Sequence, residues 1–490
     1  MPSQKSAPDK IHFIGIGGIG ISALARWFLA QGWAVSGSDL QKSDLTEELV
    51  HEGASIKVGH RKTNVPKGLS MAIYSNAITP GSSGYLELEE VRKMQIRPMS
   101  YPQTVGCLTE VYKTVSVSGS HGKSTTTAMI GLILKDSPIQ PTIIVGTKLK
   151  ELHGKNFWLG ENQNSHTFGW LVLEADEWRG AFLHYHPDIA VITNIDREHL
   201  DFYKDLNDLK RTFLKFMTRV KPGGSLVLNR DDKNLFSLSP LISKIAKKSS
   251  LKMYWYSVRS TKDASRVKKH LKLPGKHNLS NALAALTVTR DILHIPEKNV
   301  LAKLGSYSGA WRRMEFKGEL KTKNRRLKTR IEVYDDYAHH PTEIQATLQA
   351  FREKFPGAEL VTVFEPHQAK RLKALYKEFT TAFHDTDQLI LLPVYEVAGR
   401  DNKEAVFTSE KLARDIKKKY PKKTVLYLAN PKKLKELIAQ TLPPRPPDVR
   451  SKKYSRKSGP RPLRRGYPPN PVIIMMGAGS VANLTPLLFK

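Results

Sequence analysis

Residues 119–127 read Gly-Ser-His-Gly-Lys-Ser-Thr-Thr-Thr, and they directly follow the run Thr-Val-Ser-Val-Ser at 114–118, in which polar and apolar side chains alternate. This order is typical of a strand that leads through a glycine turn into a helix. Backbone N–H groups in such a turn converge at the helix start and bind phosphate. Lys123 can reach the β- and γ-phosphates, and the hydroxyl of Ser124 can bind Mg²⁺. The stretch therefore predicts a nucleoside triphosphate site, although Val117 stands where the full G-x-x-x-x-G-K-[ST] motif has its first glycine.

The length and composition predict a globular protein of several domains. The chain has 490 residues, 40% of them hydrophobic, and at roughly 150 residues a domain we expect about three domains. The single cysteine, Cys107, excludes an intramolecular disulfide and is typical of a reducing compartment. No apolar stretch reaches the ~18 residues of a membrane span, and the glycine-containing run at 11–21 lacks the pattern of a signal peptide. We therefore expect a cytoplasmic protein without a membrane partner.

The formal net charge of +32 is the least ordinary feature of the composition. Basic residues are spread along most of the chain, with a dense, proline-rich exception at 442–470, which carries nine Lys or Arg against one Asp. This composition favours a solvated insert over a nucleic-acid-binding arm. A basic chain also suits anionic nucleotide substrates, so we expect no nucleic-acid partner and keep a nucleic-acid-associated ATPase as an alternative.

A second glycine motif lies near the N-terminus. Residues 11–20 read Ile-His-Phe-Ile-Gly-Ile-Gly-Gly-Ile-Gly, and a helix is expected over 21–31. A strand at 35–38 then ends at Asp39, which follows the glycines at the spacing of about 20 residues found in the dinucleotide fingerprint. Taken alone, this pattern indicates an NAD(P) domain, so an NAD-dependent oxidoreductase is a second alternative. A further strand at 71–75 is followed by Asn76, in another loop expected to face a ligand.

Strands and helices alternate along the rest of the chain. Helices are expected at 125–134 and around 278–293. Strands are expected at 143–145, 170–173, 189–193, 225–228, 330–334, 360–364, 388–392 and 472–476. This alternation predicts α/β domains with mostly parallel sheets.

Acidic and imidazole side chains follow two of these strands. The strand at 170–173 is followed by Glu174-Ala175-Asp176-Glu177, and the strand at 189–193 by a loop that contains His199 and Asp201. The carboxyl ends of parallel strands meet at one edge of a sheet, which is also where the phosphate loop is expected. Carboxylates, a hydroxyl and an imidazole at that edge favour one or two Mg²⁺ ions held against phosphates over surface charge and helix capping.

Two further loops in the last third of the chain carry polar side chains. Residues 335–343 read Asp-Asp-Tyr-Ala-His-His-Pro-Thr-Glu, with a helix expected from Pro341, and residues 364–371 read Phe-Glu-Pro-His-Gln-Ala-Lys-Arg. Each follows a strand, so both are expected at a sheet edge. The adjacent histidines lack the Cys or H-x-x-x-H partners of a zinc site.

The order of these motifs resembles that of the Mur ligases, the ATP-dependent ligases that form the amide bonds of peptidoglycan precursors. The resemblance covers nearly the whole chain except the basic insert, and an ordered series of motifs is far more specific than any one glycine loop. The motifs that carry it lie at residues 13–20, 37–40, 119–127, 174–177, 193–201, 275–281, 312–313, 335–343 and 366–367.

The resemblance implies an α/β fold of three domains. Residues 1–108 would form a Rossmann-like domain that binds a UDP-sugar, residues 109–314 a central P-loop ATPase-like domain that binds ATP, and residues 315–490 a Rossmann-like C-terminal domain containing the insert at about 442–470.

The resemblance also implies a role for individual residues. The catalytic residues would be Lys123, Glu174, His199, Arg313 and Asp336. ATP would be bound by Gly119, Ser120, His121, Gly122, Lys123, Ser124, Thr125, Asn278, Asn281, Arg313 and Asp336, with the two asparagines near the adenine. Mg²⁺ would be bound by Ser124, Glu174 and His199. The UDP-sugar would be bound by Gly15, Gly17, Gly18, Ser38, Asp39 and Asn76, and the incoming amino acid by Tyr337, His339, His367 and Arg371.

The implied reaction joins the lactyl carboxylate of UDP-N-acetylmuramate to L-alanine through an acyl phosphate, with ATP and Mg²⁺. The chain departs from the pattern of L-alanine-adding members at two places. Trp178-Arg179 stands where they usually have Ser-Asp, and Gln368 stands where they usually have Arg. That arginine would help to bind the carboxylate of the amino acid, so a related ligase that joins a tripeptide to the same UDP-sugar is the alternative within the family.

Overall fold

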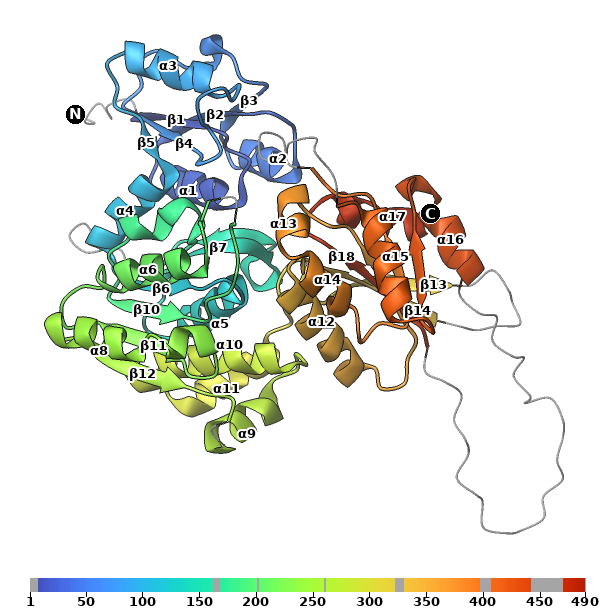
Figure 1. Ribbon diagram of the computed structural model, residues 1–490. Helices are drawn as coiled ribbons and strands as arrows, with labels where there is room; N and C mark the ends of the chain where they lie inside the picture. The colour runs from blue at the N-terminus through green and yellow to red at the C-terminus, as the bar shows by residue number, and fades with distance from the viewer. Residues whose placement is uncertain are drawn as a thin grey trace, which may run out of the picture. The chain divides into compact units, whose positions relative to one another are not determined.

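The computed structural model describes residues 8–161, 168–200, 202–259, 261–321, 330–396, 407–441 and 470–489 (Figure 1). The chain divides into two compact units, one made of Met1–Leu273 with His277–Ala310 and the other of Pro274–Lys276 with Trp311–Lys490. The first unit holds a five-stranded and a seven-stranded sheet, and the second holds a six-stranded sheet. Within the described ranges, no helix combines the length and the apolar character needed to cross a membrane. The insert expected at 442–470 lies outside the described residues, apart from Asn470.

The first sheet has the order β3-β2-β1-β4-β5, and all of its strands are parallel. The strands are β1 (Lys10–Ile14), β2 (Ala34–Asp39), β3 (Ser55–Val58), β4 (Met71–Tyr74) and β5 (Met99–Ser100). The connecting helices are α1 (Ile19–Ala30), α2 (Asp44–His51), η1 (Lys62–Asn64), α3 (Tyr85–Lys93) and α4 (Tyr101–Val111). The strand order reverses between β1 and β4, and a ligand crevice is expected at such a switch point.

The second sheet has the order β12-β11-β10-β6-β9-β7-β8, and only β8 runs antiparallel to its neighbour. The strands are β6 (Lys113–Ser118), β7 (Thr142–Leu149), β8 (Lys155–Trp158), β9 (Trp170–Glu174), β10 (Ile189–Ile192), β11 (Ser225–Asn229) and β12 (Lys252–Tyr256). The helices are α5 (Lys123–Lys135), η2 (Lys150–Leu152), η3 (Trp178–His184), α6 (Leu206–Met217), α7 (Lys233–Phe236), α8 (Ser239–Lys248), α9 (Thr261–His270), α10 (Lys276–Leu286), η4 (Thr287–Ile292) and α11 (Glu297–Ser306).

The third sheet has the order β13-β14-β18-β15-β16-β17, with β13 antiparallel at one edge. The strands are β13 (Glu315–Lys321), β14 (Arg330–Asp336), β15 (Leu360–Phe364), β16 (Gln388–Leu391), β17 (Thr424–Tyr427) and β18 (Val472–Met476). The helices are α12 (Pro341–Lys354), α13 (Ala369–Ala374), α14 (Tyr376–Ala382), α15 (Ser409–Lys419), η5 (Pro431–Lys433), α16 (Leu434–Thr441), η6 (Ser480–Asn483) and α17 (Thr485–Phe489).

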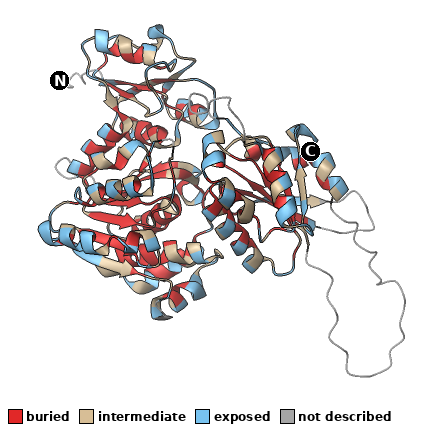
Figure 2. Ribbon diagram, in the orientation of Figure 1, coloured by how far each residue is buried: buried red, intermediate tan, exposed pale blue. Residues whose placement is uncertain are grey.

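The central strands of the two larger sheets are buried along their whole length, as Figure 2 shows in red. Strands β10, β15 and β18 have the sequences IAVI, LVTVF and VIIMM. Such continuous apolar runs are typical of parallel strands that helices cover on both faces. Helices such as α6 bury one side, with Leu209, Phe213 and Phe216 inside and charged residues outside.

These findings confirm the expected α/β fold with mostly parallel sheets, and they correct several boundaries. Helix α5 begins at Lys123, two positions before the expected start, because Gly122 adopts φ 82° and ends the turn directly before it. The helix expected around 278–293 is α10, which continues into a π-helical turn over Thr287–Ile292. Strands β3, β5, β8, β12, β13 and β17 were not expected from the sequence.

Candidate active site

The phosphate loop lies between β6 and α5 and is shaped by two glycines with positive φ. Gly119 has φ 135° and Gly122 has φ 82°. A Cβ at Gly122 would lie 2.5 Å from Oδ1 of Asn281, and a Cβ at Gly119 would overlap the hydroxyl of Thr193. Only glycine therefore fits at either position. The contact with Gly122 places the carboxamide of Asn281 at the phosphate loop itself.

The end of the neighbouring strand β10 holds the middle of this loop. The backbone N–H of His121 donates to Oδ1 of Asn194 at 2.8 Å, and the carbonyl of His121 accepts from Nδ2 of Asn194 at 2.9 Å. The imidazole of His121 lies 3.1 Å from Oδ2 of Asp196, and the hydroxyl of Ser120 accepts from the N–H of Asp196 at 2.8 Å. Asn194 and Asp196 were not among the expected site residues. Their position directly after a buried strand was the available signal.

Lys123, the first residue of α5, points back across the loop. Its ammonium donates to the carbonyl of Gly119 at 2.7 Å and to Oε2 of Glu177 at 2.8 Å. Burial by itself would lower the pKa of Lys123, but the carboxylates of Glu177, Asp176 and Glu174 outweigh it and raise the pKa above its ordinary value. Lys123 therefore carries its positive charge at neutral pH, next to the loop that would surround the phosphates.

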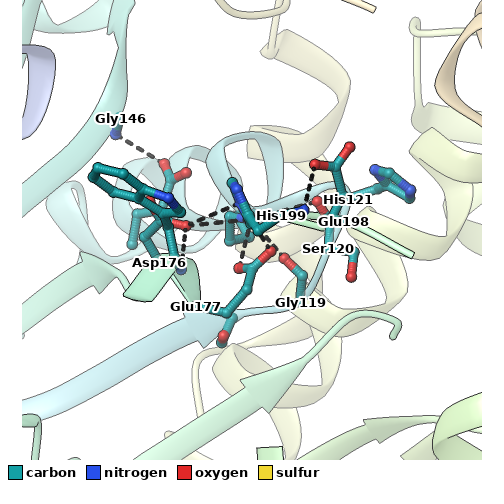
Figure 3. Close-up of polar contacts among 12 residues, drawn as sticks. Gly119, Ser120, His121, Gly146, Asp176, Glu177, Glu198 and His199 are labelled. Carbon is teal, nitrogen blue, oxygen red and sulfur yellow. Dashed lines mark hydrogen bonds and ion pairs between the residues drawn. The ribbon is translucent and has the colours of Figure 1, made fainter. Parts of the chain in front are cut away.

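Two donors fix the carboxylate of Glu174, at the end of β9. Oε1 accepts from the hydroxyl of Ser124 at 3.1 Å. Oε2 accepts from the N–H of Gly146 at 2.8 Å, the contact drawn as a dashed line at Gly146 in Figure 3. A Cβ at Gly146 would lie 2.6 Å from Oε2, so a larger residue there would displace the carboxylate of Glu174. The structure thus brings together Ser124 and Glu174, two of the residues expected to bind Mg²⁺.

His199, the third of these residues, lies beside the next two carboxylates of the same motif. Its Nε2 is 3.6 Å from Oε1 of Glu177 and 3.9 Å from Oδ1 of Asp176 (Figure 3). One ligand atom from each of Asp176, Glu177 and His199 lies within 4.8 Å of the others, a grouping able to hold a cation. Oε1 of Glu177 is fully buried and makes no hydrogen bond within the described part of the chain. The sequence predicted Glu177 only as part of the acidic run 174–177 and not as an individual site residue. Asp201 lies outside the described residues.

The expected UDP-sugar residues meet at the carboxyl edge of the first sheet. The N–H of Gly17 donates to Oδ2 of Asp39 at 2.8 Å, and the N–H of Gly15 donates to the carbonyl of Ser38 at 2.9 Å. A Cβ at Gly17 would lie 2.9 Å from Oδ2 of Asp39, so a larger residue there would displace this carboxylate. Gly18 is the residue before α1. Asp39 thus fixes the glycine turn directly.

A buried carboxylate supports the end of β2. The hydroxyl of Ser38 donates to Glu87 at 2.5 Å, and His12 and His60 each lie 3.2 Å from the same carboxylate. Burial would raise the pKa of Glu87, but the hydrogen bonds from His12, His60, Ser38 and Asn64 outweigh it and hold the pKa well below its usual range. Glu87 is therefore a charged, fully buried anchor for the expected substrate residue Ser38.

Asn76 and the unusual pair Trp178-Arg179 meet between the first two sheets. The guanidinium of Arg179 donates to the carbonyl of Asn76 at 3.3 Å and lies 4.9 Å from the centre of the Trp178 ring. Arg179 adopts φ 53°. An arginine thus replaces the usual acidic residue next to an expected UDP-sugar residue.

The expected residues of the second unit form a group at the ends of β14 and β15. The guanidinium of Arg313 lies 5.9 Å from the ring centre of Tyr337. Ring centres are 5.3 Å apart for Tyr337 and His339 and 5.9 Å apart for His339 and His367. Nη1 of Arg371 lies 3.3 Å from Nδ1 of His367. The expected amino-acid residues are therefore neighbours in the fold.

Asp336 is held inside this unit by backbone donors. Its carboxylate accepts from the N–H of Met314 at 2.8 Å and from the N–H of Ala338 at 2.9 Å. Burial raises the pKa of Asp336 to about 6, against the effect of those donors and of Arg313. Asp336 thus braces the turn after β14 in addition to the role implied for it.

Gln368 occupies a strained position directly after His367. It has φ 68° and only 6% of its surface is exposed. Its N–H donates to the carbonyl of Tyr395 at 2.9 Å, while its side-chain amide makes no hydrogen bond to any described residue. The His367 ring stacks on Tyr395 with ring centres 5.5 Å apart. A ligand at this position would therefore displace no hydrogen bond of the Gln368 side chain within the described residues.

Comparison with known proteins decides the family. Residues 10–113 match the catalytic domain of the Mur ligase family, residues 117–289 the Mur ligase middle domain and residues 312–448 the glutamate ligase domain of Mur ligases. The chain is 38% identical over 436 residues to the UDP-N-acetylmuramate–L-alanine ligase of Geotalea uraniireducens, which covers 86% of this chain and 90% of the relative. The chain belongs to the Mur ligase family.

Two further Mur ligases match over almost the whole chain. The UDP-N-acetylmuramate–L-alanine ligase of Sulfurihydrogenibium sp. is 34% identical over 491 residues, covering 98% of this chain and 97% of the relative. The solved structure of the UDP-N-acetylmuramate-alanine ligase of Thermotoga maritima has a TM-score of 0.71 at 23% identity and covers 98% of both chains. This structural similarity shows the shared Mur ligase fold. Membership of the family argues against the oxidoreductase and the nucleic-acid-associated ATPase.

Proposed function

We propose that the protein is the ATP-dependent ligase that joins UDP-N-acetylmuramate to L-alanine, an early amide-forming step of peptidoglycan precursor synthesis, with release of ADP and phosphate. The observation that carries the proposal is the charged Lys123 in a phosphate loop, with Glu174, Glu177 and His199 gathered at the same sheet edge. The L-alanine ligases named above are relatives over most of the chain.

The reaction needs activation because a carboxylate is a poor electrophile at neutral pH. The lactyl carboxylate oxygen attacks the γ-phosphorus of ATP, ADP leaves, and an acyl phosphate forms. The amine of the amino acid then attacks the acyl carbon, phosphate leaves, and an amide remains. Lys123 offsets negative charge that builds up on the transferred phosphoryl group, and the N–H groups of the glycine loop bind the neighbouring phosphates.

The carboxylate cluster has the donor chemistry for Mg²⁺. The buried Oε1 of Glu177 lacks a hydrogen-bond partner among the described residues, and carboxylate and hydroxyl oxygens suit a hard divalent cation. Ser124, Glu174 and His199 are the residues proposed to hold it, with Asp176 and Glu177 close by. When bound, Mg²⁺ would neutralise phosphate charge during phosphoryl transfer. Without Mg²⁺, the hydroxyl of Ser124 and the N–H of Gly146 hold the carboxylate of Glu174 in place.

The remaining roles follow the groups described above. Gly15, Gly17, Gly18, Ser38, Asp39 and Asn76 are proposed to bind the UDP-sugar. Tyr337, His339, His367 and Arg371 are proposed to bind the amino acid, with Arg371 facing its carboxylate. Asn278, Asn281, Arg313 and Asp336 keep the nucleotide roles that the resemblance implies.

The proposal is tested by phosphate release from ATP in the presence of UDP-N-acetylmuramate and a panel of acceptors. L-alanine, L-serine, glycine and an L-Ala-γ-D-Glu-containing peptide are supplied one at a time, and the amide product is identified by mass. Release that requires both UDP-N-acetylmuramate and L-alanine is the expected result. Preference for the peptide would support the tripeptide ligase, which Gln368 in place of arginine keeps open. Turnover without the UDP-sugar would contradict both.

A further inference from the structure

A hairpin of the central sheet reaches the helix that follows the first glycine turn. Strands β7 and β8 form this hairpin, and both contact α1. Strand β7 also carries Gly146, whose N–H holds Glu174. Strand β7 therefore contributes to the expected ATP site through Gly146, and both β7 and β8 contact helix α1 of the expected UDP-sugar domain.

Asn156, on β8, contacts α1 at its first residue. Its side chain is fully buried, and Nδ2 donates to the carbonyl of Ile19 and to the hydroxyl of Ser22, the latter at 3.0 Å. Ile19 is the first residue of α1 and directly follows Gly18. The Ser22 hydroxyl itself donates to the carbonyl of Ile19 at 3.0 Å. Asn156 thus holds the first turn of a helix whose first residue lies 137 positions earlier in the sequence.

Arg26 fixes the orientation of the Asn156 amide. Oδ1 of Asn156 accepts from Nη1 of Arg26, and because a guanidinium only donates, the amino group of Asn156 must face Ile19. Arg26 is 3% exposed and donates to Glu48 at 2.7 Å and to Glu52 at 2.9 Å. The amide therefore cannot exchange its oxygen and nitrogen without placing two donors against each other.

We propose that Asn156 is a positioning residue for the sugar nucleotide: from the central sheet it holds the first turn of α1 in the place where the backbone of the glycine turn meets the diphosphate. The inference rests on the proposed function. Phosphate recognition by a helix start depends on where its N–H groups point. A small shift of Ile19 moves the N–H groups at the start of α1 directly. The phosphate loop of the ATP site is held by different contacts, those of Asn194 and Asp196.

The test compares variants in the phosphate-release assay and in calorimetric binding of UDP-N-acetylmuramate alone. Asn156→Asp keeps the acceptor for Arg26 but replaces the amino group by an oxygen that faces the Ile19 carbonyl. We expect its KM and Kd for UDP-N-acetylmuramate to rise about tenfold, or roughly 1.4 kcal/mol. The KM for ATP and kcat should stay within about twofold, which a general loss of structure would not allow.

Two further variants keep the inference falsifiable. Ser22→Ala removes the second acceptor of Asn156 together with the bond from the Ser22 hydroxyl to the Ile19 carbonyl, while the bond from Asn156 to that carbonyl stays. Its KM for UDP-N-acetylmuramate should rise about threefold, as fits the loss of weak neutral hydrogen bonds. Lys93→Met is the control, because Lys93 is an exposed residue of α3 whose ammonium pairs with Glu90 at 3.7 Å, apart from the contacts of Asn156 and Arg26. Its kinetics should match the wild type.

The outcomes separate the inference from the proposed function. Wild-type affinity for UDP-N-acetylmuramate in both Asn156→Asp and Ser22→Ala would overturn the inference, as would equal losses in the KM for ATP and in kcat. If Asn156→Asp does not fold, the result with Ser22→Ala decides. A wild-type protein that neither binds nor turns over UDP-N-acetylmuramate would instead overturn the proposed function.

Discussion

The ammonium of Lys123 lies 2.8 Å from Oε2 of Glu177, a carboxylate that is completely buried. The lysine also donates to the carbonyl of Gly119, so without nucleotide its charge is held by the protein's own acceptors. Phosphate oxygens at the loop would offer a competing set of negative charges. The ion pair of Lys123 with Glu177 therefore holds the ammonium at the phosphate loop, where it can contact the phosphoryl group transferred from ATP.

We expect Lys123→Met to lower kcat by about 10²–10³, because one charge-stabilising contact in phosphoryl transfer is worth roughly 3–4 kcal/mol. The measurement is steady-state phosphate release, with circular dichroism and Tm to check folding. Lys150→Ala, which changes an exposed lysine of η2, is the control and should leave kcat unchanged.

Stability and catalysis can be separated at this pair. Removing one partner of a buried ion pair costs about 3–5 kcal/mol, so Lys123→Met should also lower the Tm. In the double variant with Lys123→Met, Glu177→Gln removes the carboxylate charge that the first substitution leaves unpaired. The double variant should regain most of the Tm but not the turnover. Recovery of turnover in the double variant would contradict the role assigned to Lys123.

The sequence predicted the role of Lys123 but not that of Glu177, its partner in the ion pair. Strand β18 has the expected bounds Val472–Met476, and the phosphate loop lies where expected, because apolar runs and glycine turns are local signals. Glu177 was assigned no role, because its function depends on meeting a lysine 54 positions away. Asn156 was missed for the same reason, since neither of its strand neighbours indicates a contact with α1.

The strands that were missed have a different cause. Strands β3, β12 and β17 are edge strands and are exposed or half-buried along most of their length, with sequences SIKV, KMYWY and TVLY. They lack the continuous burial that gives β10 or β15 a clear apolar run. Edge strands depend on pairing with a neighbour, which local sequence does not encode.

A second prediction concerns pH and Asp336. Burial raises the pKa of Asp336 from its ordinary value of 3.8 to about 6. A carboxyl group with a raised folded pKa stabilises the fold fully below the unfolded pKa, and this contribution is lost as pH rises through the folded pKa. At about 1.4 kcal/mol per pH unit, the loss between roughly pH 4 and pH 6 approaches 3 kcal/mol.

Asp336→Asn removes this titration. The stability of the wild type relative to the variant should fall as pH rises from about 4 to about 6, and then level off. Tm measured for both proteins across that range gives the difference directly, and the other titrating groups cancel in it. A difference that does not change with pH would contradict the raised pKa.

A third prediction concerns the basic segment at 442–470. It follows α16 and precedes β18, and its nine Lys or Arg and many prolines do not supply a core. Replacing it with a short Gly/Ser linker should leave kcat and KM within about threefold, since surface loop length has a weak effect on stability. A second variant with the basic residues changed to Gln at full length separates charge from length. Collapse of activity in either variant would show a structural or partner role for the segment.

The last prediction concerns Gln368, which is 6% exposed and follows His367 in the proposed amino-acid site. A neutral amide binds a carboxylate without the charge-assisted, bidentate contact that arginine provides. If L-alanine is the acceptor, Gln368→Arg should lower its KM by about tenfold or more, because such contacts are worth roughly 1.5–3 kcal/mol. If the acceptor is a larger peptide, the arginine should help little or should obstruct it. The KM values for L-alanine, L-serine, glycine and an L-Ala-γ-D-Glu-containing peptide are compared in both proteins. Lys370→Arg, at an exposed position of α13, is the control for an added arginine. A wild-type preference for the peptide would overturn the L-alanine assignment while leaving the ligase chemistry in place.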